Sequence, residues 1–172
     1  LSMVFIASNF QPWHGLDRLI NSINAYSGNI KISLNIIGNV DEEQVPKSTN
    51  HNFIYHGCIY DTDQLDHIYS NCNLAISSLA LYHNQITEAC VLKTREYILK
   101  GLPFIYAYND TDLINDVPFC LKFPNDASHI PIEKIIEFLG DISNDFEKIR
   151  LMSYDFAIEN LSWESKLNTL IT

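Results

Sequence analysis

The sequence is poor in basic residues: 11 lysines and arginines stand against 21 aspartates and glutamates, a formal net charge of −10 over 172 residues. A surface of that sign repels nucleic acid and anionic membranes, which argues against a general binding role on either. We therefore expect no nucleic-acid partner. Any phosphate that this protein binds must be held by a few local donors.

Long apolar runs and paired cysteines are also lacking. No run approaches the length of a transmembrane helix, and the chain shows no signal-peptide pattern. The chain opens with Leu1 in a strand-like run, so we expect it to be cut from something longer. The absence of a Cys-x-x-Cys pair favours reduced thiols in a cytoplasmic protein. The four cysteines are Cys58, Cys72, Cys90 and Cys120.

Several motifs of catalysis and cofactor binding are missing. There is no Walker A loop and no Gly-x-Gly-x-x-Gly, so an NAD site is poorly supported, and Ser77-Ser78 lacks the Gly-x-Ser-x-Gly context of a hydrolase. The six histidines do not pair with cysteines or carboxylates at ligand spacing, so we expect no metal site. The triplet Asp61-Thr62-Asp63 stands where a helix should begin and is interpreted as a cap. No cofactor is expected.

What the sequence does contain is an alternation of strand-like and helix-like segments. A content of 47% hydrophobic and 19% charged residues is ordinary for a globular protein, and we expect one domain over 1–172. Such alternation predicts an α/β, Rossmann-like fold: a mostly parallel sheet with helices on both faces and ligands at the carboxyl ends of the strands. The predicted strands are 1–7, 30–37, 52–56, 74–77, 102–106 and 119–123, and the predicted helices are 15–26, 61–72, a short central helix and the segment from 131 onward.

The most informative stretch runs from Glu88 to Pro103. Its second half predicts a short helix that ends at Gly101, because glycine favours the left-handed position after a helix and Pro103 blocks continuation. One arc of this helix is apolar, as expected for a face that packs on a core. The residues of this predicted arc are Val91, Leu92, Ile98 and Leu99.

Charged residues lie beside that apolar arc. Arg95 falls inside it and Glu96 at its edge, and an unpaired buried charge costs several kcal/mol, so each needs a partner or a ligand. From the pattern alone, an amphipathic helix whose charges meet protein neighbours is an equal alternative. The free amides at the helix start, with Lys93 and the Thr94 hydroxyl close by, suit an anion such as phosphate.

Glu88 and Glu96 resemble the E-x7-E signature of the group 1 glycosyltransferases, which are retaining enzymes of the GT-B fold, and Gly101 and Pro103 fit its second half. The resemblance implies the C-terminal, donor-binding domain of such an enzyme, without the N-terminal acceptor domain. It extends over most of the chain, because shorter matches follow in the right order. These are Ile36–Gly38, Tyr55–Gly57 and Cys72–Ser78.

The resemblance implies transfer of a sugar from a nucleoside diphosphate sugar to an acceptor glycan or lipid-linked sugar, with retention at the anomeric carbon, in polysaccharide biosynthesis. Glu88 would be the catalytic residue that contacts the donor sugar, and Glu96 would accept hydrogen bonds from the ribose. Lys93 and Thr94 would hold the diphosphate, and Gly57 lies in the base-binding region. The isolated chain is expected to be inactive, because the active site of a GT-B enzyme lies between its two domains.

The first loop departs from the family pattern. Many members carry an arginine and a lysine there, whereas this sequence has Ala7-Ser8 for the expected Gly-Arg and His14 for the lysine. We expect His14 and Arg18 to offset the charge of the diphosphate, with an exposed, structural Arg18 left open as the alternative.

Two other functions compete with this interpretation. A nucleotide-sugar epimerase of the same GT-B fold would bind a similar donor, and a flavodoxin-like binding or receiver module would need an acidic cluster that Asp17 and Asp61 do not make. We expect Trp163 to pack the last helix against the body of the domain. A cytoplasmic location is expected, which could extend to the inner face of the membrane through the missing domain.

Overall fold

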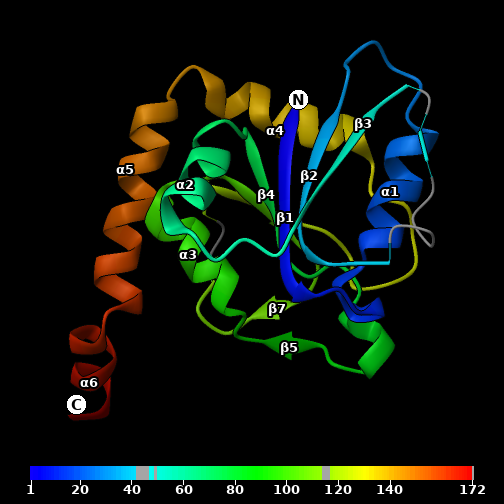
Figure 1. Ribbon diagram of the computed structural model, residues 1–172. Coiled ribbons are helices and arrows are strands. Elements are labelled where there is room, and N and C mark those ends of the chain that lie inside the picture. The colour runs from blue at the N-terminus through cyan, green and yellow to red at the C-terminus, as the bar shows by residue number, and fades with distance from the viewer. Residues whose placement is uncertain (42–46, 49, 114–116, 172) are drawn as a thin grey trace.

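The structure is a computed structural model that describes residues 1–41, 47–48, 50–113 and 117–171 (Figure 1). Its strands are β1 Ser2–Asn9, β2 Ser33–Asn39, β3 Asn52–Gly57, β4 Leu74–Ile76, β5 Glu88–Ala89, β6 Phe104–Tyr106, β7 Asn109–Asp110 and β8 Cys120–Lys122. Its α-helices are α1 Leu16–Ala25, α2 Thr62–Ser70, α3 Leu92–Lys100, α4 Ile132–Ser143, α5 Phe146–Phe156 and α6 Trp163–Ile171. Shorter turns are the 3-10 helices η1 Pro12–His14 and η3 Leu81–Asn84 and the π-helical turn η4 Ala157–Leu161. Within the described ranges, none of the helices is both long enough and apolar enough to span a membrane.

Six strands form one parallel sheet in the order β3-β2-β1-β4-β6-β8. Along the chain, β2 and β3 are added on one side of β1, and β4, β6 and β8 are then added on its other side. This is the strand order of a Rossmann fold. This confirms the predicted α/β class. The reversal of direction between β1 and β4 creates a crevice at their carboxyl ends, where ligands of such sheets bind.

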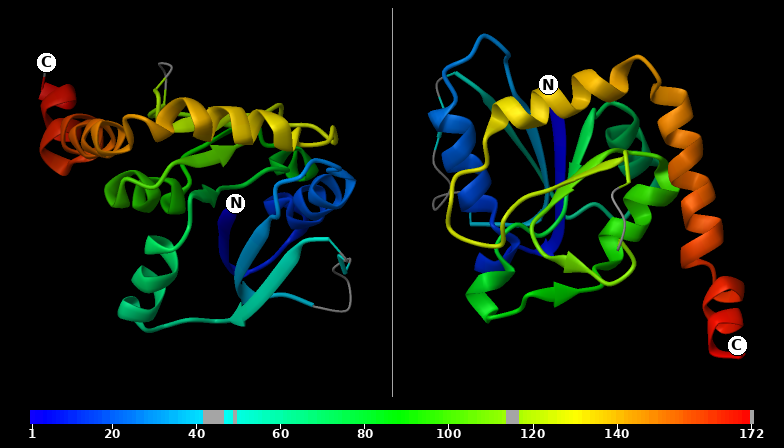
Figure 2. Two further views of the ribbon diagram at one scale, coloured as in Figure 1. Left: turned by 90° about the horizontal axis from the view of Figure 1, so that it is seen from above. Right: turned by 180° about the vertical axis from the view of Figure 1, so that it is seen from behind.

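The sheet is buried on both faces because its strands alternate between two apolar clusters. Met3 and Phe5 of β1 pack with α1 and α4, whereas Val4 packs with α2, α3 and α5. Figure 2 shows α4 crossing one of these faces. The carboxyl edge of the sheet lies at the bottom of Figure 1. The helices do not cover this edge, which is instead lined by loops, η1 and the small strands β5 and β7.

The end of β1 departs from a regular ladder. The pairing with β2 shifts between Ile6 and Asn9, and Gly38 of β2 has a φ of 128°. A Cβ on Gly38 would stand 1.6 Å from the carbonyl oxygen of Ala7, so only glycine lets the two strands approach here. This close approach fixes the position at which the chain leaves the sheet toward η1.

Two predicted boundaries are confirmed by their capping groups. The Asp61 carboxylate accepts a hydrogen bond from the amide of Gln64 at 2.8 Å, so it caps α2 as the sequence indicated. Gly101 ends α3 in the left-handed conformation with a φ of 61°. The sequence missed η3 and the pair β5 and β7, which are too short for a periodic signal, and the segment after 131 is three helices rather than one run.

The predicted apolar arc of α3 is wrong in two of its members. Leu92 is 83% exposed and Leu99 57% exposed, while the buried residues are Thr94, Tyr97 and Ile98. These three follow an i, i+3, i+4 pattern, so the helix does bury one face. The sequence did not reveal this face because one of its members, Thr94, is polar. Trp163 also differs from expectation: it is 84% exposed and does not pack α6 against the domain.

Candidate functional site

The carboxyl edge of the sheet brings the loop after β1 against the loop after β4. The amide of Leu79 donates to the carbonyl of His14 at 2.9 Å, and a Cβ on Gly15 would meet the Leu79 Cβ at 2.9 Å. Gly15 has a φ of 75°, so both the backbone conformation and the contact require glycine at the start of α1. His14 is thereby fixed at the crevice between β1 and β4.

Lys93, in the first turn of α3, is directed to the same crevice. Its ammonium donates to the carbonyl oxygen of Ile6 at 2.9 Å and lies 5.3 Å from the centre of the Phe5 ring. Burial removes water from this cation and lowers the pKa of Lys93 to about 8. Within the described residues, no carboxylate forms an ion pair with this ammonium.

His14 lies near this cation and is neutral at pH 7. Burial, followed by the positive charge of Lys93, lowers the pKa of His14 to about 4. Its Nδ1 accepts a hydrogen bond from the amide of Gln11 at 3.0 Å, so the proton of the neutral ring is on Nε2. The Nε2–H group is a donor for an acceptor oxygen.

Glu96 lies on the side of α3 that faces α2 and is partly buried. Burial, followed by the charge and hydrogen bonding of the nearby Glu96 carboxylate, raises the pKa of Tyr69 on α2. A carboxylate has two acceptor oxygens, so Glu96 can accept a hydrogen bond from a ligand in addition to its contact with Tyr69.

Glu88 and Gly57 both lie at the exposed edge. Glu88 begins β5, is exposed, and forms no hydrogen bond or ion pair within the described part of the chain. Gly57 ends β3 with a φ of 65° and has open space where a Cβ would stand. The next residue, Cys58, places its thiol 3.9 Å from the carbonyl of Ser8, so the loop after β3 reaches the end of β1.

Arg18 is buried beneath the loops that follow β4 and β8. Its Nε donates to the carbonyl of Ser128 at 2.7 Å, Nη1 to the carbonyls of Leu79 and Pro124, and Nη2 to Asp126 and the Ser128 hydroxyl. All five N–H donors of the guanidinium therefore have protein acceptors. The structure favours the alternative that Arg18 is structural, although it is buried and not exposed.

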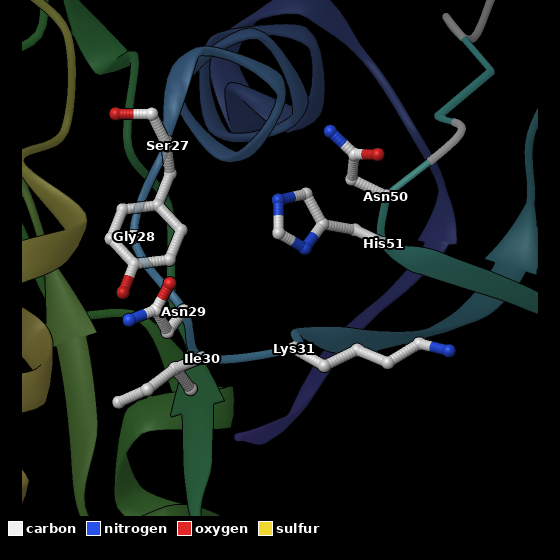
Figure 3. A pocket seen from close by; sticks show the side chains of 8 residues that line it. Ser27, Gly28, Asn29, Ile30, Lys31, Asn50 and His51 are labelled. Carbon is white, nitrogen blue, oxygen red and sulfur yellow. The ribbon is translucent and has the colours of Figure 1, made fainter.

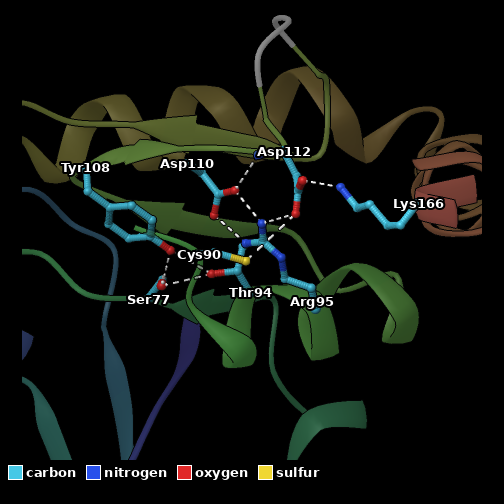
Figure 4. A network of polar contacts seen from close by, with 8 residues as sticks. All are labelled: Ser77, Cys90, Thr94, Arg95, Tyr108, Asp110, Asp112 and Lys166. Carbon is cyan, nitrogen blue, oxygen red and sulfur yellow. Dashed lines mark hydrogen bonds and ion pairs between the residues drawn. The ribbon is translucent and has the colours of Figure 1, made fainter. Parts of the chain in front are cut away.

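Thr94 was expected at the anion site and is instead fully buried. Its hydroxyl lies 2.7 Å from the Tyr108 hydroxyl and 3.1 Å from that of Ser77, which in turn lies 3.0 Å from Tyr108. The three hydroxyls satisfy one another in the core (Figure 4). Thr94 is therefore not among the groups that the structure presents to a ligand.

A second Asp-x-Asp triplet, Asp110-Thr111-Asp112, escaped the sequence analysis. Its carboxylates are paired with Arg95 of α3, and Asp112 also pairs with Lys166 of α6 (Figure 4). Arg95 therefore pairs with protein carboxylates, which was one of the two alternatives that the sequence pattern of α3 left open. Across the described residues, no group of three or more histidines, cysteines or carboxylates could hold a metal ion.

Two cavities lie away from the carboxyl edge. One, of about 350 Å³, precedes β2 and β3 and contains the ring of His51, whose Nε2 is buried without a partner among the described residues (Figure 3). The other, of about 430 Å³, lies among α2, the end of α3 and α5 and is lined in part by Tyr69 and Arg150. Neither contains a residue predicted for the donor site.

Solved structures with the same fold are glycosyltransferases. The catalytic domain of cholesterol-alpha-glucosyltransferase from Helicobacter pylori has a TM-score of 0.63 and 13% identity, over 91% of this chain and 97% of that one. A glycosyltransferase from Rickettsia africae has a TM-score of 0.67 and 17% identity, over 99% of this chain and 46% of that one. Anabaena HepE, solved with UDP, has a TM-score of 0.56 and 15% identity, over 90% of this chain and 42% of that one.

The chain thus spans less than half the length of the last two proteins. No protein-family model and no curated protein sequence matches it. At 13–17% identity, these likenesses establish the fold and not the substrate. The protein has the Rossmann-like fold of one half of a GT-B glycosyltransferase, which confirms the fold that the sequence resemblance implied.

Proposed function

We propose that this chain is the donor-binding half of a retaining glycosyltransferase, which holds a nucleoside diphosphate sugar while a hexose passes to an acceptor on another domain. The observation that carries the proposal is the pair Lys93 and His14 at the crevice between β1 and β4. In a chain of net charge −10, a largely buried ammonium and a neutral imidazole face this edge, and within the described residues no carboxylate forms an ion pair with either.

An anion would complete this arrangement. A diphosphate supplies the negative charge that Lys93 lacks, and its oxygens can accept from the Nε2–H of His14 and from the free amides at the start of α3. The same groups would stabilise the charge that grows on the leaving diphosphate as the glycosidic bond breaks. Arg18 and Thr94 have no part in this contact, since their polar groups are satisfied inside the domain.

The two glutamates would hold the remaining parts of the donor. Glu96 would accept from the ribose hydroxyls, and the exposed Glu88 would contact the transferred sugar and stabilise the developing oxocarbenium-like charge. Anabaena HepE is solved with UDP and with UDP-glucose, which supports a uridine donor as the first to test. The acceptor would be a glycan or lipid-linked sugar on the domain outside this chain, and we place the reaction in the cytoplasm.

Titration calorimetry of the chain with UDP, GDP, ADP and NAD tests this proposal. We expect one diphosphate to bind more tightly than the others and NAD to bind least, with weaker binding at higher salt. A clear preference for NAD would overturn it. The epimerase alternative predicts the same binding, and is separated by finding an altered sugar instead of a glycosylated acceptor among the products of the two-domain protein.

A further inference from the structure

The strand that carries Glu88 is too small to hold itself in place. β5 has two residues, and among the described residues it pairs only with the two residues of β7, Glu88 with Asn109 and Ala89 with Asp110. One further hydrogen bond, from the amide of Asn109 to the carbonyl of Thr87 at 2.8 Å, continues this pairing. Even a full two-stranded ribbon is marginal in water, so other groups must fix Glu88 relative to α3.

Arg95 is placed to do this. It lies on α3 between Lys93 and Glu96, and its two terminal nitrogens form ion pairs with both carboxylate oxygens of Asp110, one of them at 2.6 Å. The Asp110 side chain is wholly buried, and that of Arg95 is 14% exposed. A guanidinium that meets a carboxylate through two parallel bonds fixes orientation as well as distance. The bond thus joins the helix of the nucleotide contacts to the strand paired with β5.

Asp112 and Lys166 extend the same ion-pair network to α6. Asp112 accepts from Arg95 on one oxygen and from Lys166 on the other, and its amide donates to Asp110 at 3.0 Å (Figure 4). Burial alone would raise the pKa of Asp112, but the hydrogen bonds from Lys166 and Arg95 keep this pKa below its ordinary value. Two cations and two carboxylates balance, so the removal of either cation leaves the network with one partly buried negative charge in excess.

Lys166 joins α6 to this network. Trp163 is 84% and Leu167 52% exposed, so neither supplies a buried apolar anchor. Within the described residues, the pair of Lys166 with Asp112 is the one ion pair that joins α6 to the body of the domain.

We propose that Arg95 is a positioning residue, and that the network of Arg95, Asp110, Asp112 and Lys166 sets the place of Glu88 relative to α3 according to how α6 is seated. The inference rests on the proposed function insofar as Glu88 contacts the transferred sugar. It adds that α6 influences the sugar contact and leaves the nucleotide contacts of α3 in place.

The test compares R95K and K166M with K100M in the full chain. Lysine keeps the charge of Arg95 but cannot bond both oxygens of Asp110, and Lys166 is 46% exposed, so K166M should fold even if R95K does not. K100M is a matched control, because Lys100 also lies on α3 and pairs with Asp66, at the end away from the site. The measurements are affinities for UDP and UDP-glucose and hydrogen exchange at the Asn109 amide.

We expect the affinity for UDP-glucose to fall about tenfold in R95K and about threefold in K166M, and that for UDP to change less than about twofold in both. Exchange at Asn109 should accelerate in both variants and stay unchanged in K100M. Equal losses for UDP and UDP-glucose, or unchanged exchange at Asn109, would overturn the inference. If the unmodified chain binds neither ligand, the proposed function fails, and the exchange measurement still decides whether the network holds β5.

Discussion

The ammonium of Lys93 on α3 donates a hydrogen bond to the carbonyl of Ile6 at 2.9 Å, where the ladder between β1 and β2 becomes irregular. The contact joins the start of a helix to the end of the central strand across 87 residues of sequence. It also places a positive charge beside the Phe5 ring, where water is scarce. A ligand anion at this point gains from the charge more than it would in open solvent.

Replacing Lys93 by glutamine should therefore weaken diphosphates selectively. We expect K93Q to bind UDP about ten- to a hundredfold less tightly, since a hydrogen bond to a charged group is worth about 1.5–3 kcal/mol, and to change uridine affinity less than about twofold. Calorimetry with both ligands measures this, and K100Q on the same helix is the control. Equal losses for UDP and uridine would show that Lys93 is not a phosphate contact.

His14 predicts a pH dependence of stability. Its pKa falls from 6.5 in the unfolded chain to about 4, so the unfolded state takes up the proton first. The contribution of the neutral ring is complete above pH 6.5 and is lost as the pH falls toward 4. Because the ring is partly exposed, we expect the free energy of unfolding to drop by about 1 kcal/mol between pH 7 and 5 through this group.

Urea unfolding of the natural chain and of H14N isolates this effect, since an asparagine oxygen can accept from Gln11 as Nδ1 does without titrating. The difference between the two should shrink on acidification. Bound UDP should reduce the acid loss, because a phosphate near Nε2 favours the protonated ring. An unchanged difference from pH 7 to 5 would show that His14 titrates normally.

The sequence predicted the fold well because apolar periodicity is a local property. The runs 1–7 and 74–77 are recognisable as buried strands without knowledge of their partners. In the sheet these two strands, β1 and β4, are neighbours, and β2 and β3 lie on the other side of β1. Periodicity along the sequence does not predict the crossover that produces this order. The same limit explains β5 and β7, whose two residues each are shorter than any periodic signal.

The site was predicted less completely because several side chains have partners far along the chain. Thr94 looks accessible at a helix start until Ser77 and Tyr108 are placed beside it. From the sequence, Arg18 could be predicted to contact phosphate, because its acceptors lie more than 100 residues away, at positions 124–128. A signal for Arg95 was available in the triplet Asp110-Thr111-Asp112, since a buried arginine requires carboxylates nearby.

Arg18 should prove structural when it is replaced by lysine. An ammonium has three donors against the five that Arg18 uses, so R18K leaves buried carbonyls of Leu79, Pro124 or Ser128 unpaired. We expect the free energy of unfolding to fall by about 2–3 kcal/mol, with UDP affinity of the folded protein changed less than about twofold. Preserved stability with a large loss of UDP affinity would instead identify a phosphate contact.

The two glutamates should separate in their effects on ligand binding. Glu96→Gln keeps the shape of the side chain and replaces one acceptor oxygen by a donor, so it should weaken UDP and UDP-glucose alike. The loss of a hydrogen bond to a charged acceptor predicts about a ten- to hundredfold reduction in both affinities. Glu88→Gln should leave UDP affinity nearly unchanged, because the exposed Glu88 on β5 is assigned to the transferred sugar in our proposal and not to the nucleotide.

Glu88→Gln should instead lower turnover in the two-domain protein, since the carboxylate is expected to stabilise charge that develops only as the sugar leaves. Titrations of both folded variants with UDP and UDP-glucose, together with transfer assays on the two-domain protein, measure the separation. Glu88→Asp is a useful control variant, because it keeps the negative charge but shortens the side chain by one methylene. If Glu88→Gln abolished UDP binding while Glu96→Gln did not, the assignments to sugar and ribose would be reversed.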